Sequence, residues 1–205
     1  MVDWRRVAMG HDLCRQGEPF EFIYAVRSGT FKSSLSLSNG HQQICAFPMC
    51  GDIIGMDGVA SGQCASTVTA LDDAQVCAIA YAPLVDLLAR DPALQRRVNR
   101  QMGYELARGR RLLLLMGPFS AQERLAAFLL DLSQRFSAHG YSAREFNLRM
   151  SRIEIASFLG LSHETISRAF SALQREGLLH IDKRRVRITV LEHFARRFEA
   201  LLRVD

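Results

Sequence analysis

The sequence predicts an α+β protein in which an antiparallel β-roll is followed by a long helix and then by a winged helix-turn-helix. Three observations support this order. Short alternating or β-branched runs separated by glycines extend from Arg6 to Ala80, which is typical of a sandwich or jelly roll. Helical spacing then continues from Pro92 to Met116, and two short helical patterns with a hairpin pattern lie near the C-terminus. We expect the roll at residues 1–90, the long helix at 91–117 and the winged domain at 118–205.

The composition is that of a globular protein with a modest basic excess. Of the 205 residues 48% are hydrophobic, which allows a sizeable core and favours two domains. Before residue 120 there are 12 Lys and Arg against 11 Asp and Glu, and from there on 14 against 10, so the excess lies in the winged part. No secretory signal or membrane-length apolar run is present, so we expect a cytoplasmic protein without membrane contact. No carboxylate pair, activated nucleophile or metal-binding spacing indicates an enzyme.

The expected strands of the roll are short and are punctuated by turns. Asn39-Gly40 between two strand-like runs is a strong hairpin signal. The glycine-rich stretch from Gly51 to Gly62 lacks the GxxxxGK[ST] pattern of a phosphate-binding loop, so we interpret it as turns. The five expected strands are Phe22 to Arg27, Thr30 to Leu37, His41 to Phe47, Ser66 to Leu71 and Gln75 to Ala80.

The long helix carries a stripe with coiled-coil spacing. Asp91 is expected to cap it, Pro92 to open it and Gly117-Pro118 to end it. The stripe could pack against the roll of the same chain. We favour a dimer seam, because the apolar run from Leu112 to Met116 exceeds what one domain face needs. The seam residues are Asn99, Met102, Leu106, Gly109, Leu113 and Met116.

Two capping boxes indicate helix starts in the last third of the chain. Ser120 with Glu123 opens a helix through Phe136, and Ser151 with Glu154 opens a second, shorter one. A short strand is expected between them at Phe146, Leu148 and Met150, and a terminal helix from Glu192 to Arg203.

The short helix is expected to end at Gly160, after which Ser162 caps a further helix. Ile166, Phe170 and Leu173 would form the buried stripe of that helix.

The opposite face of this last helix has the chemistry that reads base edges. Glu164, Ser167 and Arg168 offer a carboxylate, a hydroxyl and a guanidinium within its first turns. A solvated face on an ordinary helical hairpin would show the same pattern. DNA binding is favoured because the hairpin expected at Leu178 to Val190 carries a basic tip that could hold phosphates. The expected backbone contacts are Ser162, Ser171, Arg175, Lys183, Arg184 and Arg185, with Arg187 beside them.

Four stretches of the chain resemble the CRP/FNR superfamily of bacterial transcription regulators, most closely its oxygen-responsive FNR branch. They are YAVRSGTFKS from Tyr24, GDIIGMDGVASG from Gly51, ERLAAFLLDLSQRF from Glu123 and LGLSHETISR from Leu159. The resemblance implies a cyclic-nucleotide-binding-like β-roll and a homodimer on double-stranded DNA.

It further implies an inverted repeat of TTGA-like half-sites, with Arg168 on guanine and Glu164 on the opposite strand. Control of anaerobic or redox genes is expected, together with contact to RNA polymerase from loops of the sensor domain. By position Ser28 and the Asn39 to His41 tip are candidates for that contact, and solvated turns are the alternative interpretation of both.

Two departures from the family pattern concern the signal. Asp52 follows Gly51, and Ala65 precedes Ser66 without the arginine that fixes a cyclic phosphate, so no cyclic nucleotide is expected. Cys77 matches the fourth cysteine of the family's [4Fe-4S] cluster. The other three would lie upstream of Met1, and a cluster is expected only if the native N-terminus is longer.

We favour a start further upstream, because residues 2–8 resemble the middle of a family member. Cys14, Cys45, Cys50 and Cys64 lack CxxC spacing, and the last three are interpreted as small buried hydrophobes. An alternative is a relative that senses nitric oxide or carbon monoxide through haem or another small effector. His11 and His41 are the only histidines of the expected sensor domain, and neither has a clear partner in the sequence. Oxygen sensors commonly carry an acidic residue where Gly109 stands, so its absence should favour the dimer.

Overall fold

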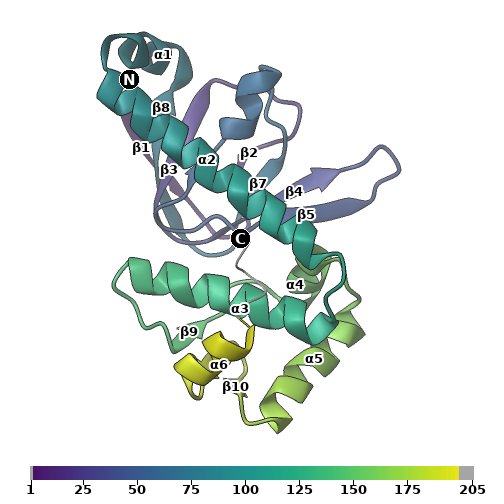
Figure 1. Cartoon of the computed structure of the whole chain (residues 1–205). Coiled ribbons are helices and arrows are strands. Elements are labelled where there is room, and N and C mark those ends of the chain that lie inside the picture. The colour runs from purple at the N-terminus through teal and green to yellow at the C-terminus, as the bar shows by residue number, and fades with distance from the viewer. Residues whose placement is uncertain (1, 199–205) are drawn as a thin grey trace. The chain divides into compact units, whose positions relative to one another are not determined.

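The computed structural model describes residues 2–198 and divides into two compact units, one up to Ala107 and one from Arg108 (Figure 1). The first unit contains β1 (Val2–Val7), β2 (Asp12–Cys14), β3 (Phe22–Ser28), β4 (Phe31–Ser36), β5 (Gln42–Ala46), β6 (Ile53–Ile54), the 3-10 helix η1 (Met56–Ala60), β7 (Thr67–Ala70), β8 (Ala74–Ala80) and α1 (Tyr81–Arg90). The boundary between the two units falls within helix α2 (Pro92–Leu115). The second unit continues with α3 (Ala121–Ala138), β9 (Glu145–Asn147), α4 (Arg152–Leu159), α5 (His163–Arg175), β10 (Leu179–Asp182), β11 (Arg185–Ile188) and α6 (Leu191–Phe198).

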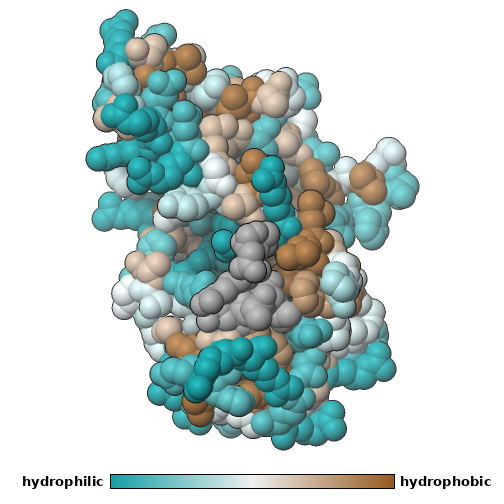
Figure 2. All heavy atoms as spheres, in the orientation of Figure 1, coloured by the Kyte–Doolittle hydropathy of each residue, from teal (hydrophilic) through white to brown (hydrophobic). Residues whose placement is uncertain are grey.

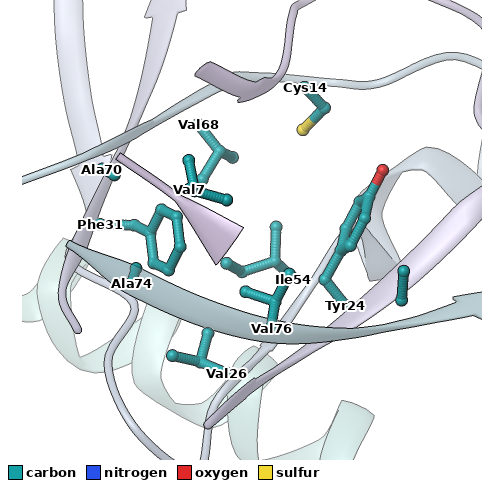
Figure 3. Packing of buried hydrophobic residues seen from close by; sticks show 11 residues of the cluster. Val7, Cys14, Tyr24, Val26, Phe31, Ile54, Val68, Ala70, Ala74 and Val76 are labelled. Carbon is teal, nitrogen blue, oxygen red and sulfur yellow. The ribbon is translucent and has the colours of Figure 1, made fainter. Parts of the chain in front are cut away.

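Two four-stranded antiparallel sheets form the first unit, in the orders β1-β8-β3-β6 and β2-β7-β4-β5. Side chains from both sheets point into the space between them, as Figure 3 shows for Val26 and Val76 from one sheet and Phe31 and Val68 from the other. Phe31 and Val76 are fully buried. Burial of this apolar surface is what holds the sheets together. The predicted antiparallel sandwich is confirmed.

The N-terminal strand β1 was not predicted. Its sequence, VDWRRV, mixes charges into both faces, so it lacks the alternation that indicates a half-buried strand. The structure pairs it with β8 from Val2 opposite Ile79 to Val7 opposite Ala74. The guanidinium of Arg5 lies 4.2 Å from the ring centroid of Phe22. This cation–π contact lets the strand carry a charge beside the core.

The predicted Asn39-Gly40 hairpin joins β4 and β5. Gly40 has φ 81°, a conformation that side chains disfavour. The turn is closed by the amide of Leu37, which donates to the carbonyl of His41 at 2.8 Å. The Asn39 side-chain oxygen also accepts from the His41 amide at 3.0 Å. Local turn chemistry therefore sets this hairpin.

Helix α2 begins as predicted. The carboxylate of Asp91 accepts from the amides of Ala93 and Leu94 at 2.9 and 3.1 Å. A separate helix, α1, precedes it and was not distinguished in the sequence, because only the extended conformation of Asp91 separates the two.

All six residues of the predicted seam are exposed in the single chain. Leu106 is 59% exposed and Leu113 is 71% exposed. Figure 2 shows hydrophobic side chains gathered along the C-terminal part of α2. The exposed members are Asn99, Met102, Leu106, Gly109, Leu113 and Met116.

Helices α3, α4 and α5 and the sheet β10-β11-β9 build the second unit. Both predicted capping boxes are confirmed, at Ser120 with Glu123 and at Ser151 with Glu154. The strand expected as far as Met150 ends at Asn147, although the amide of Leu148 still donates to the carbonyl of Arg184 at 2.8 Å.

Of two expected ends in this unit, one differs from the structure and the other lies outside the described residues. Val190 lies beyond β11 and is exposed, although it was expected on the strand. The terminal helix begins at Leu191, and its expected continuation to Arg203 lies outside the described residues.

Candidate nucleic-acid interface

A tight corner joins α4 to α5 and positions the second helix. Gly160 ends α4 in the left-handed conformation, with φ 63° and ψ 39°. The amide of Leu161 then donates to the carbonyl of Ala156 at 2.9 Å. The hydroxyl of Ser162 accepts from the amide of Thr165 at 3.2 Å and caps α5. These are the features that the sequence predicted for a helix-turn-helix.

Helix α5 is strongly two-sided. Ile166, Phe170 and Leu173 are buried as predicted, together with Ala169. The guanidinium of Arg152 at the start of α4 stacks 4.6 Å from the ring centroid of Phe170 and ties the two helices together. The structure thus brings the predicted reading residues onto one outer side of α5. Glu164, Arg168, Ser171 and Arg175 are exposed there, and Ser167 is half-buried.

One arginine of α3 was missed in the sequence although it holds the helix-turn-helix in place. Arg124 donates through Nη2 to the carbonyl of Met116 at 3.0 Å, just past the end of α2. It also donates through Nε to Phe119 at 3.0 Å and through Nη1 to Leu159, the last residue of α4, at 3.2 Å. The ends of α2 and α4 are therefore fixed to α3 by one side chain. Its position after Glu123 in a capping box carried no signal of this role.

Hydrogen bonds and charge interactions link the side chains at the N-terminus of α5, among them Glu164 and Arg168. Hydrogen bonds from its own backbone amide and from the Ser162 hydroxyl lower the pKa of Glu164, with smaller contributions from His163 and Arg168. Glu164 is therefore an ionised acceptor at neutral pH. Arg168 donates through Nη2 to the hydroxyl of Thr165 at 3.4 Å, and that hydroxyl also lies 3.0 Å from the Ser162 hydroxyl. The Glu164 carboxylate can accept hydrogen bonds from base edges, and the Arg168 guanidinium can donate hydrogen bonds to them.

Ser171 differs from the other candidate contacts on α5. Its hydroxyl donates to the carbonyl of Ser167, one turn earlier, at 3.0 Å. The same oxygen retains acceptor capacity, but its proton is already used within the helix. Arg175 lies in the last turn and is exposed.

The wing is a hairpin whose tip is Lys183-Arg184. Leu179, Val186 and Ile188 are buried beneath it, whereas Ile181 is half-buried. Lys183 adopts φ 51° and is the one described residue other than glycine with a positive φ. Arg184 donates through Nη1 to the carbonyl of Arg149 at 3.3 Å, which anchors part of its guanidinium.

Arg185 is held in an ion pair that the sequence did not reveal. Its Nε and Nη2 both contact a carboxylate oxygen of Glu145 on β9. The two residues are 40 positions apart and meet only because β9 pairs with β11. Among the predicted wing contacts Lys183, Arg184 and Arg185, it is therefore Arg185 whose guanidinium is paired with a carboxylate.

The cysteines of the described chain do not converge on a metal site. Cys77 lies on β8, between Trp4 of β1 and Ala25 of β3, and is half-buried. Within residues 2–198 no three Cys, His, Asp or Glu side chains are grouped so as to hold a metal ion. An iron–sulfur cluster does not fit these residues by themselves, because four thiolates are the usual set. His11 and His41 are both exposed, so neither lies in a buried haem pocket.

Cys14 should react slowly with alkylating agents in the folded protein. Burial, assisted by the neighbouring Cys64 thiol, raises the pKa of Cys14 to about 12. Since the thiolate is the nucleophile, Cys14 should alkylate at least tenfold more slowly than an unperturbed thiol of pKa ~8.5 in the folded protein at pH 8. Iodoacetamide labelling with peptide mass spectrometry measures the rate. The same cysteine in urea-unfolded protein is the control, and equal rates in both states would contradict the expectation.

The residues at the family's cyclic-nucleotide positions are engaged within the roll. The hydroxyl of Ser66 accepts from the Ser33 hydroxyl at 2.7 Å, and both side chains are buried. The carboxylate of Asp52 accepts from the amide of Met49 at 2.8 Å. The predicted polymerase-contact positions lie on exposed turns, Ser28 at the end of β3 and Asn39 to His41 at the β4–β5 tip.

Comparison with known protein families agrees with this architecture. The model of the Crp-like helix-turn-helix domain matches residues 123–197, and the model of the cyclic nucleotide-binding domain matches residues 4–91. None of the helices in the described part of the chain combines the length and apolar composition that a membrane span requires.

Named relatives cover most of the chain. It is 43% identical over 183 residues to the transcriptional regulatory protein btr of Bordetella pertussis, a match that covers 89% of this chain and 76% of the relative. It is 40% identical to the fumarate and nitrate reduction regulatory protein of Vibrio cholerae over 187 residues, or 91% and 74% of the two chains. Among solved structures, FixK2 from Bradyrhizobium japonicum superimposes with a TM-score of 0.85 at 29% identity and 96% coverage of both chains.

The sensor-type roll and the outward face of α5 define a DNA-binding transcription regulator. The chain belongs to the CRP/FNR family, whose members regulate transcription and are not enzymes. The resemblance found in the sequence is confirmed.

Proposed function

We propose that this regulator binds as a homodimer to an inverted repeat of TTGA-like half-sites. The observation that carries the proposal is the outer face of α5, where Glu164, Ser167 and Arg168 lie together above a fully buried opposite face. Arg168 would fork onto guanine O6 and N7, and the ionised Glu164 would accept from an exocyclic amine on the other strand. Ser167 would serve either partner.

Phosphate contacts would surround these base contacts and set the register on the duplex. The Ser162 end of α5 is a helix N-terminus, which favours negative charge. Arg175 lies in the last turn of α5, and the cations of the wing lie beyond it in the chain. The proposed backbone contacts are Ser162, Ser171, Arg175, Lys183, Arg184 and Arg185.

The dimer would form along the exposed stripe of α2. Met102, Leu106 and Leu113 recur at coiled-coil spacing and are at least 41% exposed in the single chain. A two-fold dimer with one reading helix per subunit matches an inverted repeat.

The relatives support a proposal for the signal and for the regulated genes. Their names refer to anaerobic regulation and to fumarate and nitrate reduction, so we propose control of anaerobic or redox metabolism in response to oxygen. An iron–sulfur cluster on Cys77 would require three further cysteines outside residues 2–198. Contact with RNA polymerase is proposed at Ser28 and at the Asn39 to His41 tip.

A binding titration tests the proposal. The protein should prefer a duplex with two inverted TTGA half-sites over a duplex of scrambled sequence by about a thousandfold at physiological salt. Fluorescence anisotropy with both duplexes measures the ratio, and sedimentation of the complex gives two chains per duplex. A single half-site duplex is the control and should bind much more weakly. Equal affinity for all three duplexes would refute sequence-specific reading.

A further inference from the structure

The ion pair between Glu145 and Arg185 occupies the solvent side of the wing sheet. Phe146 and Val186, opposite each other in the register, point to the buried side, so their neighbours Glu145 and Arg185 face outward. The side chain of Arg185 is 65% exposed and that of Glu145 is 30% exposed. The carboxylate is therefore the more firmly seated partner, and the guanidinium is the one that solvent or a ligand can reach.

A shallow pocket of about 190 Å³ opens on this face. Its volume is several times the ~30 Å³ of one water molecule in the liquid, so a phosphate group has room to approach. Glu145 stands opposite Arg187 in the register, and Asp182 stands opposite Arg185. Two carboxylates thus share the face with two guanidiniums. The lining residues are Glu145, His180, Asp182, Arg185 and Arg187.

We propose that Glu145 is an internal competitor for DNA phosphate at the wing and withholds Arg185 from the backbone. This inference rests on the proposed function, because it concerns the same interface. A carboxylate and a phosphate oxygen bind the same planar fork of donors, so one guanidinium cannot satisfy both fully. In the free protein the Glu145 carboxylate already binds the Arg185 guanidinium, so the wing offers one phosphate contact fewer.

The consequence is a lower affinity for every DNA sequence. Phosphate contacts carry no sequence information, so the competitor weakens random and specific binding alike. Each phosphate neutralised adds about 0.9 to the slope of log affinity against log salt. Releasing Arg185 should therefore steepen this slope by about one unit, and the fall in affinity between 50 and 200 mM salt should grow roughly threefold.

The test substitutes Glu145→Gln, which keeps the shape of the side chain and removes its charge. Affinity at 50 mM salt is expected to rise severalfold on both the inverted repeat and a scrambled duplex, and the slope to steepen by about one unit. Asp182→Asn is the matched control, because it changes the net charge by the same amount on the same face. It should raise affinity less and leave the slope nearly unchanged.

A second pair of variants tests whether the effect of Glu145→Gln depends on Arg185. In an Arg185→Ala background, Glu145→Gln should no longer steepen the slope, because the guanidinium that it releases is absent. An unchanged slope for Glu145→Gln alone, or an equal steepening in the Arg185→Ala background, would overturn the inference. Preference of the unaltered protein for the repeat over the scrambled duplex is a separate readout. If that preference is missing while Glu145→Gln still steepens the slope through Arg185, site reading fails and the competitor role stands.

Discussion

Arg168→Ala is expected to weaken binding to the inverted repeat by about 1 to 3 kcal/mol per half-site and to relax the preference at one base position. Arg168 is exposed on α5, where its guanidinium donates a long hydrogen bond to Thr165 at 3.4 Å. Its removal should therefore leave the folded unit intact. The variant lacks the guanidinium that would bind guanine. It should therefore bind duplexes changed at that base about as tightly as it binds the original repeat.

The measurement is a set of anisotropy titrations on the repeat and on duplexes altered at each half-site position. Lys183→Ala is the matched control, since Lys183 is an exposed cation at the wing tip. That variant should weaken all duplexes alike and reduce the salt slope by about one unit. Were Arg168→Ala to lose the same affinity on specific and scrambled DNA, the base-reading role assigned to Arg168 would be wrong.

The parts of the fold that the sequence predicted are those governed by neighbours along the chain. The capping boxes at Ser120 and Ser151 and the left-handed Gly160 depend on residues within one helical turn. The alternation at Val186 and Ile188 likewise reports burial directly. Strand β1 was missed because it pairs with β8, about seventy residues away in the chain, and because its Arg5 is accommodated by contacts with the rings of Phe22 and Tyr24.

In the candidate interface, too, the sequence predicted the features that depend on neighbours along the chain and missed those that depend on distant residues. Spacing along α5 was enough to place Glu164 and Arg168 on one side, because helical periodicity fixes that relation. Glu145 gave no signal in the sequence because its partner Arg185 is 40 residues away, and the bond from Arg124 to Leu159 likewise spans 35 residues. The sequence predicted Arg185 as a phosphate contact from its positive charge in the wing. The structure shows that its guanidinium is paired with the carboxylate of Glu145, which the sequence did not indicate.

Leu113→Glu is expected to abolish dimerisation at micromolar concentration and, with it, tight binding to the two-half-site duplex. Leu113 is 71% exposed in the single chain, so the substitution should not unfold the monomer. In a two-fold seam the new carboxylate would be buried twice and would face its own copy or another apolar side chain. Desolvation of a charge costs several kcal/mol per ion, and about 2.7 kcal/mol already corresponds to a hundredfold change in the dimer dissociation constant.

Sedimentation velocity and titration of the repeat measure the two consequences together. Arg111→Glu is a stringent control, because Arg111 is exposed on the opposite side of α2 and the substitution changes the charge by two units. It should remain dimeric. The Leu113 variant should sediment as a monomer and bind a single half-site duplex as well as the unaltered protein does, since α5 is untouched. A dimer that persists in Leu113→Glu would show that the exposed stripe of α2 does not hold the subunits together, and the two-fold reading of an inverted repeat would need another interface.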